Sequence, residues 1–275
     1  MRQMKAALVF LLSVVAWRVG AAQVLDEATR ARIDEAVIAE AAHQEVVGVA
    51  VGVIRDGEVA HVFCHGFEDR EAGVPVTTST MFRWASVSKP LTAIAAVQLA
   101  TSGALDLDED VRVYVPEFPD KHVRLTTRQA LGHLGGIVHY ANGEVIRTER
   151  EYEEAHPFAD VVTALDTFMA SPLVAAPGER YSYSTHGFIL ASAVVERAGD
   201  EAFASQVRAR IAEPLGMTTL RPDYQWDAIE HRATGYRRFA GRIMRSTDTD
   251  VSWKLGGGGW ISTIEDFARF GAGLV

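Results

Sequence analysis

A serine and a lysine stand three residues apart at Ser86 and Lys89, and this pair of side chains can form a nucleophile and its base. The apolar residues that follow repeat with helical spacing and predict a helix that begins near Ser86 and ends before Gly103. Residues i and i+3 share one face of a helix. A serine hydroxyl attacks once a base removes its proton, and a lysine can be that base if burial and the positive end of a helix lower its pKa. The spacing therefore supplies both groups from a single turn.

Lysine is rare in this chain, which holds four lysines against 23 arginines. One of the four occupies this position, where an arginine would stay charged at any working pH and could not take up a proton. A serine and a lysine at this spacing also occur by chance. A surface pair without function is therefore the alternative for the motif taken alone.

A second segment of chemical interest follows the turn at Pro177-Gly178. Tyr183 and Thr185 lie in an extended stretch before a predicted helix, so their side chains project to the same side. A phenol close to a lysine ammonium can act as a second proton carrier, because the pKa values of both groups can shift toward neutrality in a shielded site. Such tripeptides are common in loops, so this segment gains its meaning only from the other motifs.

The elements that must position these side chains form one predicted domain. Two β-rich runs, 46–54 and 59–67, flank Asp56-Gly57, which is a strong hairpin signal. A capping box at 126–129 opens a short helix that is expected to stop at Gly135-Gly136. Further helices are expected over 27–45, 159–169, 187–198, 201–211 and 264–274. Loop-like stretches are expected at 105–107 and 113–116, a surface loop or frayed helix at 142–156, and a turn at 256–259.

The N-terminus has the layout of a secretory signal peptide. A basic start at residues 1–5 precedes an apolar run from Ala6 to Trp17, and small residues near Ala22 offer a cleavage point. The run is short for a bilayer span, and an uncleaved N-terminal anchor is the alternative. We therefore expect a signal peptide over 1–22, a domain over 23–275 with no integral membrane segment, and a secreted or periplasmic location.

Composition excludes several classes of function. The net charge of −9 and the pI near 5.5 argue against nucleic acid as a partner, because phosphate binding needs a basic face. The nine histidines and the single cysteine, Cys64, show no spacing typical of zinc ligands, so no metal is expected. One cysteine also excludes an internal disulfide framework. The oligomeric state has no signal in the sequence.

Seven motifs follow one another along roughly residues 45–275, and this many motifs in one order are far more specific than any single one. They are Ser86-Val87-Ser88-Lys89, Leu105-Asp106-Leu107-Asp108, Tyr114-Val115-Pro116-Glu117-Phe118, Leu131-Gly132-His133-Leu134-Gly135-Gly136-Ile137, Pro177-Gly178 with Tyr181-Ser182-Tyr183-Ser184, Glu213-Pro214-Leu215-Gly216-Met217 and Gly258-Gly259-Trp260-Ile261-Ser262-Thr263. Taken together, these segments resemble the serine β-lactamase and penicillin-binding-protein superfamily, in its class C-like branch. Within it, the stretch from Tyr114 to Pro119, Val138-His139-Tyr140 and Tyr183-Ser184-Thr185 resemble the mitochondrial β-lactamase-like serine proteases and their bacterial relatives.

The resemblance implies an α+β fold in which an antiparallel sheet is flanked by helices and joined to a mostly helical half between roughly 103 and 200. It also implies that Ser86 is the acylated nucleophile, Lys89 its base partner and Tyr183 a second proton carrier, with Thr185 at a substrate-binding position. No cofactor is implied, because side chains and water suffice for acyl transfer.

Three departures from the family pattern stand out. Thr185 replaces a common Asn, and Gly135 replaces the Ser of a His-x-Ser-Gly motif. The third motif, a Lys or His followed by a small residue and Gly on a strand, does not occur before Val275. We therefore expect a domain truncated at its C-terminus, with an incomplete sheet and half of the oxyanion hole missing. Losing one oxyanion donor costs about 100- to 1000-fold in rate.

Two functions follow as hypotheses. The first is a secreted serine hydrolase that acts by acyl transfer on a small-molecule or peptide substrate, which can be a β-lactam, a D-Ala peptide, an ester or an ordinary peptide. The alternative is a non-catalytic binding or assembly protein that keeps the fold, which the three departures favour.

Overall fold

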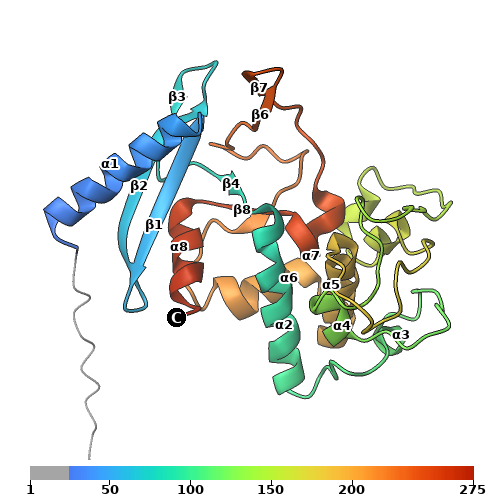
Figure 1. Ribbon diagram of the computed structural model, residues 1–275. Coiled ribbons are helices and arrows are strands. Elements are labelled where there is room, and N and C mark those ends of the chain that lie inside the picture. Colours follow the sequence, from blue (N-terminus) through green and yellow to red (C-terminus); the bar gives the residue numbers. More distant parts are fainter. Residues whose placement is uncertain (1–24) are drawn as a thin grey trace, which may run out of the picture.

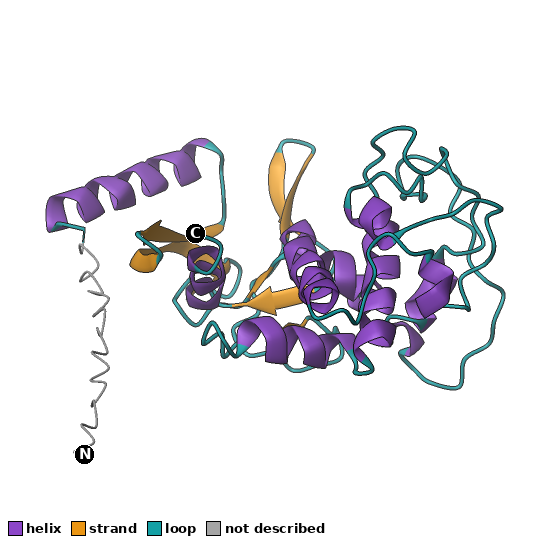
Figure 2. Ribbon diagram, turned by 90° about the horizontal axis from the view of Figure 1, so that it is seen from below, coloured by secondary structure: helices purple, strands orange, loops and turns teal. Residues whose placement is uncertain are grey.

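The computed structural model describes residues 25–275, so the predicted signal peptide over 1–22 lies outside the described residues. Figures 1 and 2 show a β-rich part, to which both ends of the described chain contribute, beside a mostly helical part. The α-helices are α1 Glu27–His43, α2 Lys89–Thr101, α3 Val111–Tyr114, α4 Thr127–Leu131, α5 Thr185–Gly199, α6 Phe203–Val207, α7 Leu255–Gly258 and α8 Ile264–Ala272. The strands are β1 Gly48–Arg55, β2 Glu58–Asp69, β3 Val74–Pro75, β4 Phe82–Arg83, β5 Arg221–Pro222, β6 Tyr236–Phe239, β7 Arg242–Arg245 and β8 Trp260–Ser262.

The hairpin predicted at Asp56-Gly57 is confirmed, and it joins β1 to β2 as an antiparallel pair. One face of the hairpin packs against α8, where a Cβ added at Gly52 would lie only 2.8 Å from Ala268 Cβ. The other face carries His61, whose Nε2 lies 2.7 Å from Asp34 Oδ1 on α1. Because side chains alternate between the faces of a strand, α1 and α8 cover opposite faces of the hairpin.

A second sheet anchors the segment that leads to Ser86. Its strand order is β4-β8-β5, with β8 in the middle and both pairs antiparallel. Directly after β4, the Trp84 backbone N–H donates to Trp260 O at 2.9 Å, and the Trp84 indole N–H donates to Ser262 Oγ at 2.8 Å. These bonds tie the start of the Ser86 turn to a fully buried strand.

The predicted α+β class is confirmed, with one correction about the sheet. In place of one antiparallel sheet, the described residues form three small ones, with strand orders β1-β2-β3, β4-β8-β5 and β6-β7. In the helical part α5 is the central element, because it packs against α2, α4, α6 and α7 and is buried along most of its length. The helical half is confirmed by α3, α4 and α5, although long loops separate them.

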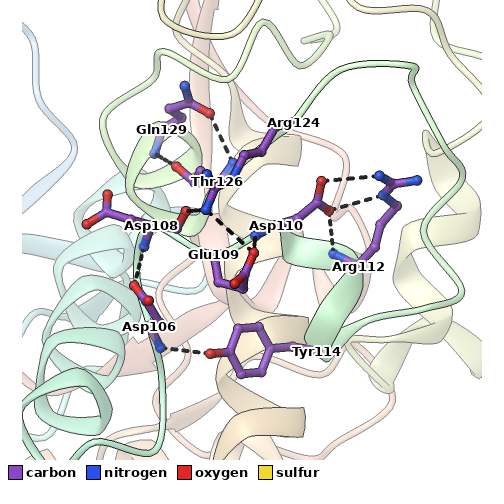
Figure 3. Close-up of polar contacts among 9 residues, drawn as sticks. All are labelled: Asp106, Asp108, Glu109, Asp110, Arg112, Tyr114, Arg124, Thr126 and Gln129. Carbon is purple, nitrogen blue, oxygen red and sulfur yellow. Dashed lines mark hydrogen bonds and ion pairs between the residues drawn. The ribbon is translucent and has the colours of Figure 1, made fainter.

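A polar network holds the chain between α2 and α4 (Figure 3). The Thr126 hydroxyl accepts from the Gln129 N–H while the Gln129 side chain accepts from the Thr126 N–H, so the predicted capping box is confirmed. Asp110 caps α3 by accepting from the Arg112 N–H at 2.9 Å. Many of the charged side chains in this network are exposed, so their ion pairs add little to the free energy of unfolding and serve mainly to fix the loop geometry.

Several predicted elements are wrong in detail. The helix expected over 159–169 is two short 3-10 turns, Pro157–Ala159 and Thr163–Thr167. Asp160 interrupts it with extended backbone, and its side chain accepts from the Thr163 N–H at 2.6 Å, at the start of the second turn. The helix expected over 201–211 is α6 followed by a π-helical turn, Arg208–Ala212.

Three further boundaries differ from the expectation. The loop-like stretch expected over 113–116 overlaps the end of α3, and the helix opened by the capping box ends at Leu131, before the predicted stop. The turn expected at 256–259 is largely a helical turn, α7, because tertiary packing against α5 decides the conformation of this glycine run. Within residues 25–275, no helix combines the length and the apolar character that crossing a membrane requires.

Candidate active site

Ser86 lies at the point where the chain leaves β4 and enters α2. The residue before it, Ala85, has a φ of +47°, in the left-handed region that non-glycine residues rarely adopt. Ala85 opens a 3-10 turn, Ala85–Ser88, that leads directly into α2. Such strained backbone persists where the surrounding structure holds it, and here it leaves the Ser86 side chain exposed.

Lys89 lies one turn further and is buried, with 6% of its surface exposed. Its Nζ donates to Ser86 Oγ at 3.1 Å, to Thr185 Oγ1 at 3.4 Å and to Gly257 O at 2.8 Å. These acceptors use all three N–H bonds of an ammonium group. Burial lowers the pKa of Lys89, and its interactions with Tyr183 offset part of that effect. A neutral Lys89 would have a lone pair free to turn toward Ser86.

Tyr183 approaches Ser86 from the other side. Its hydroxyl donates to Ser86 Oγ at 2.8 Å, and Lys89 Nζ lies 4.8 Å from its ring centre. Burial alone would raise the pKa of Tyr183, but the interactions with Lys89 and Ser86 outweigh it, so the pKa lies below its ordinary value. Ser86 Oγ therefore has two neighbours that can take its proton.

The structure places Thr185 behind Lys89. Thr185 is the first residue of α5 and is only 2% exposed, with its hydroxyl turned toward the lysine. The four predicted residues, Ser86, Lys89, Tyr183 and Thr185, thus meet at one place. Their roles in catalysis and in substrate binding stay predictions.

The shortest hydrogen bond of Lys89 goes to a backbone carbonyl of the glycine run, Gly257 O, and the sequence did not predict this contact. Gly256 O accepts from the Thr92 hydroxyl at 2.6 Å, so two successive carbonyls of α7 face α2. A Cβ at Gly257 would lie 2.7 Å from Thr185 Cγ2, so glycine allows α7 to approach α5 closely. The run of four glycines was the available signal for such an approach.

Two histidines beside Tyr183 were also missed. The ring centres of His133 and His139 lie 4.4 Å and 5.3 Å from that of Tyr183. Burial, followed by the charge of Lys89, lowers the pKa of both imidazoles. Both lie in segments that carry the family resemblance, but nothing in the sequence gives them a role beside Tyr183, because that proximity comes from the folded loop.

The arrangement contains the groups that acyl transfer would use. It offers an exposed hydroxyl nucleophile, two candidate proton acceptors whose pKa values are lowered, and neutral imidazoles nearby. Among residues 25–275, no group of three His, Cys, Asp or Glu side chains is placed to hold a metal ion.

Comparison with known proteins shows which family the chain resembles. The chain matches the β-lactamase family over residues 33–275. It is 28% identical over 291 residues to the human serine beta-lactamase-like protein LACTB, mitochondrial, covering 83% of this chain and 53% of that protein. It is 34% identical over 204 residues to esterase EstB of Burkholderia gladioli, covering 70% of this chain and 52% of the esterase. The chain thus spans about half the length of these two relatives.

Solved structures show the same fold. EstCE1, a hydrolase with promiscuous acyltransferase activity, superposes with a TM-score of 0.73 at 23% identity, covering 87% of this chain and 71% of that one. D-amino acid amidase from Ochrobactrum anthropi superposes with a TM-score of 0.72 at 22% identity, covering 87% and 70% of the two chains. With a family match that takes in every strand of the fold and the Ser86, Lys89 and Tyr183 cluster, this chain belongs to the β-lactamase family and has its β-lactamase/transpeptidase-like fold.

Proposed function

We propose that the protein is a serine hydrolase that acts by acyl transfer on an ester or amide bond through an acyl-Ser86 intermediate. One observation carries this proposal: Ser86 Oγ lies within hydrogen-bond distance of both Lys89 Nζ, at 3.1 Å, and Tyr183 OH, at 2.8 Å. A hydroxyl between two groups whose pKa values are lowered can lose its proton to either of them.

The chemistry follows in two halves. In the first, Lys89 or Tyr183 takes the Ser86 proton, Oγ attacks the substrate carbonyl, and the tetrahedral intermediate expels an alcohol or amine that leaves with a proton from the same pair. In the second, water loses a proton to that pair and attacks the acyl-serine, and Ser86 regains its hydrogen as the acid product leaves. No atom is needed beyond those of the substrate, water and these side chains.

The substrate class we favour first is an ester. The support is the 34% identity to an esterase and the likeness in fold to a hydrolase with acyltransferase activity. Amides come second, because the fold is also that of a D-amino acid amidase. We also propose that the protein is exported, for which the support is the layout of residues 1–22. Protein recovered from the periplasm should then have the mass expected after cleavage at Ala22.

A fluorophosphonate probe tests the nucleophile, and p-nitrophenyl acetate tests turnover. We expect covalent labelling of the native chain, none in Ser86→Ala, and a loss of about 100- to 10,000-fold in acylation rate in Lys89→Arg, whose guanidinium cannot accept a proton. Ser88→Ala is the matched control, because its buried Oγ has no hydrogen-bond partner among the described residues, so the substitution breaks no hydrogen bond there. Labelling that survives Ser86→Ala would overturn the proposal and favour the non-catalytic alternative.

A further inference from the structure

Two histidines of the loop after α4 accept hydrogen bonds from the two backbone N–H groups that directly follow Tyr183. His133 Nδ1 accepts from the Ser184 N–H at 3.1 Å, and His139 Nδ1 accepts from the Thr185 N–H at 3.3 Å. Ser184 is the N-cap of α5 and Thr185 its first residue. The first N–H groups of a helix have no partner inside the helix, so the two imidazoles satisfy donors that would otherwise be unpaired.

The same loop surrounds the Tyr183 side chain. The His133 ring lies tilted by 35° against the phenol ring, and the His139 ring meets it edge-on at 82°. The His133 carbonyl also accepts from the Ser182 N–H at 2.8 Å, so bonds from this loop reach the backbone on both sides of Tyr183. His133 itself has a φ of +57°, a left-handed conformation that costs free energy and that this set of contacts maintains.

These hydrogen bonds require one particular form of each imidazole. A ring nitrogen that accepts an N–H bond carries no proton, so both rings are neutral with the proton on Nε2. A protonated ring has no acceptor, and it would also place a positive charge beside Lys89.

The titratable groups that face the two rings are Lys89 and neighbouring aromatic or imidazole side chains, which do not stabilise a charged imidazole. His133 faces Lys89, His139, Tyr181 and Tyr183. His139 faces Lys89, Tyr140, Tyr183 and His186. Among residues 25–275, no carboxylate lies within ion-pair distance of either ring, and burial and Lys89 lower the pKa of both.

We propose that His133 and His139 are positioning residues: their neutral imidazoles hold the backbone and the ring of Tyr183 so that its hydroxyl stays on Ser86, and protonation of the rings releases this hold. The part that concerns catalysis rests on the proposed acyl transfer at Ser86. Tyr183 reaches Ser86 from a segment 97 residues away in the chain, so its 2.8 Å contact depends on how that segment is held. Acylation should therefore switch off as the two rings take up protons.

The test compares two substitutions at His139. In His139→Asn the amide oxygen takes the place of Nδ1 and accepts the Thr185 N–H without titrating, whereas His139→Leu keeps the bulk and loses the acceptor. We expect the Leu variant to acylate about 10- to 100-fold more slowly with p-nitrophenyl acetate, which is part of the 100- to 10,000-fold that a positioned proton carrier supplies. The Asn variant should recover most of the native rate, and the acid limb of its acylation profile should move to lower pH.

A purely structural role would give a different result. The Leu variant would then lose rate only in proportion to its folded fraction, and the acid limb would be the same in all three proteins. That outcome would overturn the proposal. The pair His133→Asn and His133→Leu repeats the comparison at Ser184.

A second readout does not depend on activity. Long-range ¹⁵N–¹H NMR spectra of the labelled chain should show both imidazoles as the neutral form with the proton on Nε2 at pH 7.5. The amide signals of Ser184 and Thr185 should shift as the rings take up protons. Spectra that place the proton of His133 and His139 on Nδ1 would overturn the inference, even if Ser86 is acylated. If both imidazoles are neutral with the proton on Nε2 but no acylation depends on Ser86, the positioning of Tyr183 by the two histidines stands and the proposed function fails.

Discussion

Alanine at Gly257 should lower both stability and acylation, because this glycine lies where α7 packs against α5. The new Cβ would lie 2.7 Å from Thr185 Cγ2 and 3.1 Å from Thr185 O, so α7 must move away from α5. Overpacking of a core typically costs about 1–3 kcal/mol. In a domain of this size each kcal/mol lowers Tm by about 2–4 °C, so we expect Tm to fall by about 2–12 °C.

In the native chain the Gly257 carbonyl lies 2.8 Å from Lys89 Nζ, and the same movement of α7 would lengthen this hydrogen bond. A hydrogen bond from the neutral amine contributes about 0.5–1.5 kcal/mol. Each 1.4 kcal/mol of lost positioning lowers a rate about tenfold, so acylation of Ser86 should fall by about 2- to 10-fold. The loss should appear in the folded protein, well below its Tm.

The neighbouring glycine provides the control. A Cβ at Gly258 would meet its nearest atoms, the Ala85 carbonyl carbon and oxygen, at 3.4 Å, which is ordinary van der Waals contact. Tm by circular dichroism and the rate of fluorophosphonate labelling should therefore change little in Gly258→Ala and clearly in Gly257→Ala. Equal values in the two variants would refute the reasoning that close approach of α7 positions the lysine.

Two further predictions concern stability. Burial lowers the pKa of His186 from 6.5 to about 4. Between these pH values the unfolded chain binds more protons than the folded one, so the free energy of unfolding falls as the pH drops. The loss from pH 7 to pH 4 amounts to about 3 kcal/mol. Urea unfolding from pH 7 to pH 4 should show this loss, and His186→Asn should show less of it; identical slopes would contradict the assignment. Asp223 is fully buried between Arg83 and Arg232, so Asp223→Asn should cost about 3–5 kcal/mol in urea unfolding. Asp227→Asn removes the partly exposed carboxylate of another arginine pair and should cost about 1 kcal/mol or less, and equal losses would count against the burial argument.

Elements with strong local patterns were predicted well. The Asp56-Gly57 hairpin and the capping box at 126–129 formed as expected, because turn chemistry and capping act within a few residues. The predicted helix over 159–169 did not form. There the buried Asp166 accepts from the Tyr152 hydroxyl at 2.6 Å, and the Thr148 N–H donates to its backbone carbonyl, so contacts with a distant loop replace helical ones.

For the candidate site, the sequence by itself determined the reactive pair. Ser86 and Lys89 face each other because three residues make nearly one helical turn, and this geometry is local. The resemblance to a family added Tyr183 and Thr185 by residue type and order. None of this reveals whether the lysine is buried, which decides its pKa.

Only the tertiary structure decided what surrounds the pair. Tyr183 meets Ser86 across 97 residues, and the Gly257 carbonyl meets Lys89 across 168. A backbone carbonyl has no residue type to identify it, and an imidazole that accepts a backbone N–H looks like any other histidine in the sequence. These contacts arise from the packing of α2, α5 and α7 around a common core, and local periodicity carries no information about which distant backbone groups that packing brings together.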